Sequence, residues 1–405
     1  MRSFLFLQGP ISPFFRRLGA RLRAGGHPVT RINLCPGDWL CWPGGEGVLN
    51  FHGRRAAWPG FVGAAMDRAA VTDLVLLGEQ RPYHLAAIAE ARARGIAVSV
   101  TDFGYIRPDW ITLERDGMNG CSRFPREPAA IRALAEGLAA PDGDALYADR
   151  FATQAAWDVA FHLANLAPWP FPHHRTFLLH HPIPAYLGTL ARLLRAGANG
   201  RRAQATLRAL PEGAPLFLFA MQMETDYSIR AYSRFGSMDE ALGEAITSFA
   251  RAAPGGAHLV TKIHPLDPGL KRWGARIALM AQASGVAGRV HFVDGGPLDG
   301  VLRRAAGVVT VNSTVGVRCL QLGTPVAPLG EALWDVEGLA HRGPLDAFWG
   351  APAAPDPELA RQWLAAAARH LHIRGVYYAE PGLSAAVDAA ADLLARGAVG
   401  PPAAR

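Results

Sequence analysis

The densest group of chemically active side chains spans residues 222–230, with the sequence QMETDYSIR. It directly follows the apolar run 215–220, which predicts a strand. Ligands of open α/β sheets bind beyond the carboxyl ends of strands, so Glu224 and Asp226 lie where a catalytic carboxylate belongs. Such a carboxylate can act as a nucleophile toward an oxocarbenium-like centre. Capping of the following helix by Thr225 and Asp226 is an equally good interpretation.

Two further polar clusters follow predicted strands in the same half of the chain. Lys262 and the His-Pro pair at 264–265 follow one strand, while Asn312, Ser313 and Thr314 follow another and open a helix. His264, together with small hydroxyls at a helix N-terminus, can hold a phosphate without a metal. A lone histidine is more often structural. Two such clusters at equivalent strand ends favour a nucleotide phosphate site.

The segment 101–114, TDFGYIRPDWITLE, combines a strand end with dense polar and aromatic side chains. Asp102 is the candidate acid or base, Arg107 a candidate anion clamp, and Tyr105 or Trp110 a surface on which a sugar could stack. The alternative is structural: Asp102 caps a turn, and Arg107 pairs with an acid of the same segment.

A fourth candidate site is the turn at residues 8–15, QGPISPFF, between a predicted strand and helix. Gln8 begins this turn, and the amides of the following helix are open to an anion. The turn does not match GxGxxG, and no acid about 20 residues on marks a dinucleotide ribose, so NAD binding is disfavoured. An ordinary strand-to-helix turn is an equally good interpretation.

The elements that position these groups alternate between strand and helix along the chain. Strands at 3–7, 28–34, 47–51, 74–78 and 96–101 with intervening helices predict a parallel sheet, and a second such series starts at 215. The sequence therefore predicts an α/β fold with two Rossmann-like domains facing a cleft. The expected division is 1–200, 201–355, and 356–405 as C-terminal helices and tail.

Composition narrows the class of protein further. The 405 residues are 50% hydrophobic and 19% charged, which excludes a small module or a disordered chain. Of the 41 basic residues two are lysines, leaving 39 arginines, and the net charge is +7. The arginines are scattered without an RGG tract, which argues against nucleic acid as a partner. The four cysteines lack metal-ligand spacing, and no apolar run fits a signal peptide or a membrane span, so a cytoplasmic location is expected.

Five segments together resemble capsular polysaccharide biosynthesis/export proteins of the KpsS/LipB type. The similarity covers most of residues 1–330. The segments are FLFLQGPISPFFRRLGARLRAGGHPVTRINLCPGD near the start, LLGEQRPYH at 76–84, FGYIRPDWITLE at 103–114, QMETDYSIR at 222–230 and KIHPLD at 262–267.

The resemblance implies a GT-B-like, retaining β-Kdo glycosyltransferase that uses CMP-Kdo, needs no metal, and starts the capsule linker on a lysophosphatidylglycerol anchor. By matched motif it implies Asp226 as the nucleophile or key carboxylate with Gln222 beside it. It places Asp102 on the acceptor side, where the family usually has two acids and this chain has Asp102-Phe103. The remaining expected site residues are His264, Lys262, Asn312, Ser313 and Thr314 for the nucleotide, and Gln8, Tyr105 and Arg107 for the acceptor or sugar.

Two other functions compete with this one. A non-catalytic capsule assembly or export component could retain the transferase fold, and a related transferase could use another CMP- or nucleoside-diphosphate-sugar. Expected partners are the CMP-sugar, a lysophospholipid, other capsule assembly proteins and the anionic cytoplasmic face of the inner membrane, to which the protein would be peripheral. The membrane-facing side chains would be Arg192, Arg195, Arg201, Arg202 and Arg208, although a solvated helix face explains them equally well.

Overall fold

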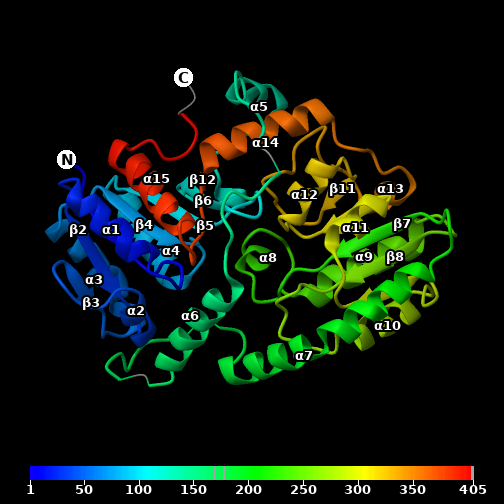
Figure 1. The fold of residues 1–405 in the computed structure, drawn as a ribbon, viewed down its shortest axis with the longest axis horizontal. Coiled ribbons are helices and arrows are strands. Elements are labelled where there is room, and N and C mark those ends of the chain that lie inside the picture. The colour runs from blue at the N-terminus through cyan, green and yellow to red at the C-terminus, as the bar shows by residue number, and fades with distance from the viewer. Residues whose placement is uncertain (142, 168, 177, 403–405) are drawn as a thin grey trace. The chain divides into compact units, whose positions relative to one another are not determined.

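The computed structural model describes residues 1–402 apart from 142, 168 and 177. The chain divides into two compact units, and Figure 1 shows the elements of both. The first unit comprises Met1–Phe124, Leu134–Phe177 and Leu364–Arg405, and the second comprises Pro125–Ala133 and Leu178–Trp363.

The first unit is built on a seven-stranded sheet in the order β12-β6-β5-β4-β1-β2-β3. Strands β1 to β5 run parallel, whereas β6 is antiparallel to β5, and β12 is antiparallel to β6. The strands are β1 (Phe4–Phe6), β2 (Val29–Asn33), β3 (Val48–Asn50), β4 (Asp73–Leu77), β5 (Ala97–Phe103), β6 (Trp110–Arg115) and β12 (His372–Arg374).

Helices connect these strands in the expected rhythm. The first helix, α1, buries Phe14, Phe15, Leu18 and Leu22 on one face and ends at Ala24, just before Gly25, as the sequence predicts. It packs against α15, from the far end of the chain. The helices are α1 (Phe14–Ala24), α2 (Pro36–Cys41), α3 (Trp58–Arg68), α4 (Pro82–Ala93), α6 (Phe151–Ala164) and α15 (Gly382–Arg396), with 3₁₀ turns at Arg55–Ala57 and Asn119–Cys121.

The second unit contains a five-stranded, fully parallel sheet in the order β11-β10-β7-β8-β9. Its strands are β7 (Leu216–Ala220), β8 (His258–Lys262), β9 (Val290–Val293), β10 (Gly307–Thr310) and β11 (Val326–Pro328). Its helices are α7 (Pro182–Arg208), α8 (Tyr227–Ala231), α9 (Met238–Ala252), α10 (Trp273–Ala283), α11 (Leu298–Arg304), α12 (Val315–Leu322) and α13 (Leu345–Gly350), while α5 (Pro128–Leu134) and α14 (Pro357–Leu371) cross between units.

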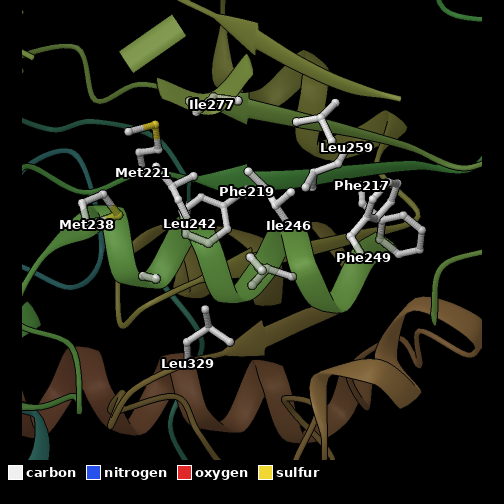
Figure 2. Packing of buried hydrophobic residues seen from close by; sticks show 14 of the residues in the cluster. Phe217, Phe219, Met221, Met238, Leu242, Ile246, Phe249, Leu259, Ile277 and Leu329 are labelled. Atoms are coloured by element: carbon white, nitrogen blue, oxygen red, sulfur yellow. The ribbon is translucent and has the colours of Figure 1, made fainter. Parts of the chain in front are cut away.

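Helix α9 forms the centre of the second unit's core, as Figure 2 shows. Ser237 caps its first turn by accepting a hydrogen bond from the Glu240 amide. The buried face then packs on the sheet, and each such side chain contributes about 1.5–3 kcal/mol when removed from water. The contributing residues are Met238, Leu242, Ile246 and Phe249 of the helix and Phe217, Phe219 and Leu259 of the strands.

The α/β fold with two Rossmann-like units is confirmed, but the units differ in extent from the expected domains. Helix α7 begins inside the expected first domain and belongs to the second unit, because its inner face packs on β9. The C-terminal segment returns to the first unit, because β12 pairs with β6. Within the residues described, no helix combines the length and the hydropathy that crossing a membrane requires.

Candidate functional site

A reciprocal amide pair joins the carboxyl ends of β7 and β10 in the second unit. The Gln222 Nε2 donates to Asn312 Oδ1 at 2.9 Å, and the Asn312 backbone N–H donates to Gln222 Oε1 at 3.0 Å. Both side chains are 5% exposed. Since the two strands are neighbours in the sheet, the pair forms a buried polar floor at the edge where α/β folds bind ligands.

Asp226 and Ser228 lie above this floor and are half-buried. Asp226 Oδ1 accepts the Ser228 backbone N–H at 2.9 Å and so caps α8, as the structural interpretation predicted. Its other oxygen lies 3.4 Å from Gln222 Nε2. Ser228 Oγ in turn lies 3.1 Å from Asn312 Oδ1. The structure therefore brings Asp226 and Gln222 together and adds Ser228, which the sequence analysis missed although it lies inside the same motif.

Lys262 and His264 follow β8, the neighbour of β7. Lys262 is buried, and its ammonium donates to the carbonyl oxygens of Gly295 and, at 2.9 Å, of Gly296. Burial lowers the pKa of Lys262, and the Asp294 carboxylate opposes that change. Lys262 thus stabilises the loop after β9. His264 is half-buried, and its Nδ1 accepts the Leu266 backbone N–H at 3.1 Å.

Ser313 and Thr314 open α12 beside Asn312. Ser313 Oγ accepts the Val315 N–H at 3.2 Å, and the Ser313 carbonyl accepts the Trp334 indole N–H at 3.0 Å. The indole lies so close to the first turn of α12 that a Cβ on Gly316 would meet it at 2.0 Å. Both hydroxyl residues are half-buried, and the Gly316 N–H donates to the Ser313 carbonyl at 3.0 Å. The positive end of the α12 dipole therefore lies beside these two residues.

Gln8 belongs to a buried network in the first unit. Its Nε2 lies 3.3 Å from both carboxylate oxygens of Asp38, and Asp38 pairs with Arg31 at 3.2 Å. The Leu34 backbone N–H also donates to Asp38 at 2.7 Å. All three side chains, of Arg31, Asp38 and Gln8, are under 8% exposed. They therefore contact one another inside the fold and are not open to a ligand. The sequence signal for the network was an arginine inside an apolar strand, seven residues before a carboxylate.

Asp102 and Arg107 lie at the end of β5 and in the turn after it. Asp102 is half-buried, and its Oδ1 accepts the Phe103 N–H at 2.7 Å, as the turn interpretation predicted. Arg107 is exposed, and its guanidinium lies 5.2 Å from the centre of the Phe103 ring. Both side chains remain accessible to a ligand.

Tyr105 is placed differently from the expectation of a stacking surface. Its ring is 7% exposed, and its hydroxyl accepts the Asn119 N–H at 3.0 Å. The Tyr105 N–H donates to His372 Nε2 at 2.9 Å. A buried ring has no face for a sugar, so a stacking role for Tyr105 is not retained.

Glu79 and His84, after β4, received no role in the sequence analysis. Glu79 is 3% exposed, and burial, with a smaller effect of Asp102, raises its pKa to about 7. His84 is fully buried, its Nδ1 lies 2.7 Å from the Gly78 carbonyl, and burial lowers its pKa to about 3. A glutamate directly after an apolar strand, in LLGEQ, was the available signal. Glu79 is thus a second carboxylate at the same edge of the sheet as Asp102, because β4 and β5 are neighbours.

The second unit's edge thus offers amide, hydroxyl, imidazole and carboxylate groups on three neighbouring strands. Such a set suits the phosphate and hydroxyl groups of a nucleotide sugar. In the part of the chain that the structure describes, no three His, Cys, Asp or Glu side chains are grouped as a metal site requires.

Comparison with known proteins gives several matches. The family model described as capsule polysaccharide biosynthesis protein matches residues 72–378. The capsule polysaccharide export protein KpsS of Escherichia coli is 28% identical over 382 residues, which is 93% of this chain and 97% of KpsS. The capsule polysaccharide modification protein LipB of Neisseria meningitidis serogroup A is 28% identical over 386 residues, 93% of this chain and 92% of LipB. Among solved structures, the β Kdo 2,7 transferase of Thermosulfurimonas dismutans KpsC has 13% identity and a TM-score of 0.48, covering 97% of this chain and 100% of that one.

Proposed function

The chain belongs to the capsule polysaccharide biosynthesis family, and on that basis we propose that it is a retaining glycosyltransferase of capsule assembly. The proposed reaction transfers β-Kdo from CMP-Kdo to a lysophosphatidylglycerol-type lipid and so starts the capsule linker. The choice of donor and acceptor rests on the resemblance of the five sequence segments to the KpsS/LipB type.

One structural observation carries the proposal: the hydrogen-bonded group of Gln222, Asn312 and Asp226 at the carboxyl ends of β7 and β10. A buried amide pair fixes the floor, while the carboxylate above it stays half-exposed. This arrangement supports a donor site in the second unit, because the neighbouring N-terminus of α12 can bind the CMP phosphate without a metal.

The proposed mechanism is a double displacement at Asp226. One oxygen of its carboxylate attacks the anomeric carbon of Kdo, and the bond to the CMP phosphate breaks with its electron pair on the phosphate. His264 and the positive end of the α12 dipole stabilise that leaving charge. The acceptor hydroxyl then gives its proton to a general base and displaces Asp226, and two inversions restore the original configuration. Asp102 stays the candidate residue on the acceptor side.

Purified protein incubated with CMP-Kdo and a lysophosphatidylglycerol analogue, with the product read by mass spectrometry, tests the proposal. We expect one Kdo residue on the lipid, and absence of product would overturn it in favour of a non-catalytic assembly component. Competition by other CMP- or nucleoside-diphosphate-sugars identifies the donor.

Asp226→Asn separates chemistry from folding, because asparagine caps a helix about as well as aspartate. We expect the variant to keep its melting temperature and its CMP affinity but to lose transfer. Transfer at the wild-type rate would show that Asp226 is a helix cap and not the nucleophile.

A further inference from the structure

Helix α7 carries a stripe of exposed apolar side chains. Ile183, Leu187, Leu190 and Leu194 are 47%, 63%, 53% and 80% exposed. Their spacing of four, three and four residues places them on one face of the helix. Large apolar side chains occur singly on most protein surfaces, whereas a contiguous stripe marks an interaction site.

The opposite face of α7 is fixed to its own unit. A Cβ on Gly188 would lie 2.1 Å from the Pro268 carbonyl oxygen, so the helix backbone touches the loop after β8 there. Arg192 pairs with Asp294, and Asn199 donates to the same carboxylate at 2.9 Å. These contacts leave the apolar stripe of Ile183, Leu187, Leu190 and Leu194, hereafter the leucine stripe, on the side of α7 that faces away from the sheet.

The charge of α7 is entirely positive. Its 27 residues contain five arginines and no aspartate or glutamate. Arg192 is neutralised by Asp294, and the other four arginines are exposed. No ion pair within the described residues involves any of these four, Arg195, Arg201, Arg202 and Arg208.

We propose that α7 docks the protein on the surface of an anionic phospholipid bilayer. The leucine stripe enters the acyl boundary, and the four free arginines lie among the headgroup phosphates. The absence of any acid along 27 residues favours anionic lipid over a second copy of this chain, which would bring the same arginines to the interface. The inference extends the proposed function, in which the acceptor is a lipid, but needs no transfer chemistry.

Co-sedimentation of the full chain with vesicles tests the docking. Vesicles contain either phosphatidylcholine alone or phosphatidylcholine with phosphatidylglycerol, in low and high salt. We expect binding to the anionic vesicles that weakens with salt, and at least about tenfold weaker partitioning onto the neutral ones. Absence of binding to anionic vesicles would overturn the proposal.

Two sets of variants assign the binding to α7. Changing Leu187, Leu190 and Leu194 to serine, or the four free arginines to glutamine, should each lower partitioning at least about tenfold. The matched controls are Leu279→Ser, a 66% exposed leucine on α10, and glutamine at four exposed arginines elsewhere. Those control arginines are Arg16, Arg68, Arg132 and Arg303.

Folding and oligomeric state complete the test. Circular dichroism and a thermal melt of each variant must match the wild type, since the altered side chains face solvent. Partitioning of the α7 variants equal to that of their controls would overturn the proposal. So would light scattering that shows a wild-type dimer dissociated by the leucine changes, because the stripe would then be a self-interface. The vesicle assay contains no sugar donor, so a failed transfer assay leaves its result intact.

Discussion

The carboxyl ends of the strands carry similar polar residues in the two sheets, but the two units use them differently. In the first unit Gln8 is buried with Asp38 and Arg31, and its amide nitrogen lies within hydrogen-bond distance of the Asp38 carboxylate. In the second unit Gln222 and Asn312 are buried, and they lie beneath the half-exposed side chains of Asp226 and Ser228. At the end of β7, the buried amide pair therefore satisfies the fold and leaves the side chains above it available to a ligand.

The strongest test of this difference is Asp38→Ala in the first unit. The change leaves the Arg31 guanidinium, 2% exposed, without its carboxylate. An uncompensated buried charge should lower the free energy of unfolding by about 3–5 kcal/mol. Urea unfolding followed by tryptophan fluorescence measures it. Asp388→Ala is the control, because its pair with Arg21 is exposed on both sides and should contribute far less. An equal loss of unfolding free energy in Asp38→Ala and Asp388→Ala would refute the structural role of the buried Arg31, Asp38 and Gln8 group.

The second prediction concerns Glu79 and pH. Burial raises its pKa from 4.5 to about 7, so between these values the folded chain keeps a proton that the unfolded chain has lost. This stabilisation is complete below about pH 4.5 and is lost as pH rises through 7, and it amounts to about 3 kcal/mol. Glu79→Gln cannot titrate. The free energy of unfolding of the wild type, relative to the variant, should therefore fall by about this amount between pH 5 and 8.

His84 makes the comparison with the variant necessary. Burial lowers its pKa from 6.5 to about 3, so its contribution to stability is lost as pH falls below 6.5. The two groups therefore give opposite slopes between pH 4.5 and 6.5, and the wild-type curve alone would hide both. Glu136→Gln, at an exposed glutamate of the same unit, serves as the control. Parallel curves for wild type and Glu79→Gln would contradict the raised pKa.

The sequence predicted the elements of this fold better than their pairing. Apolar spacing located α1, and an apolar run located β7, because both signals are local. The pairing of His372 in β12 with Thr112 in β6 joins residues 260 positions apart, and no local pattern encodes it. For the same reason Lys262, expected on a phosphate, could not be foreseen binding the carbonyl oxygens of Gly295 and Gly296.

The third prediction compares one glutamine from each sheet. Gln222→Ala removes the partner of the buried Asn312 N–H, which should lower the free energy of unfolding by about 1–3 kcal/mol. It should also weaken CMP binding, because Asp226 and Ser228 lose the floor beneath them. Gln8→Ala should lower stability without changing CMP affinity. Calorimetric titration with CMP measures the affinity of each variant. Equal CMP affinities of Gln222→Ala and Gln8→Ala would contradict the proposal that only the second sheet holds the nucleotide.

His264→Ala should have the smallest effect on stability and a clear effect on binding. The ring is half-buried, and its hydrogen bond with the Leu266 N–H contributes about 1 kcal/mol. If the imidazole contacts the CMP phosphate, the affinity for CMP should fall about tenfold to a hundredfold. His258→Ala is the matched control, because His258 begins the same strand, β8, and contacts His291 at the opposite end. Calorimetry should show unchanged CMP affinity for that variant. An equal loss of CMP affinity in both variants would mean that the substitutions act by distorting β8, and not by removing a contact with CMP at its carboxyl end.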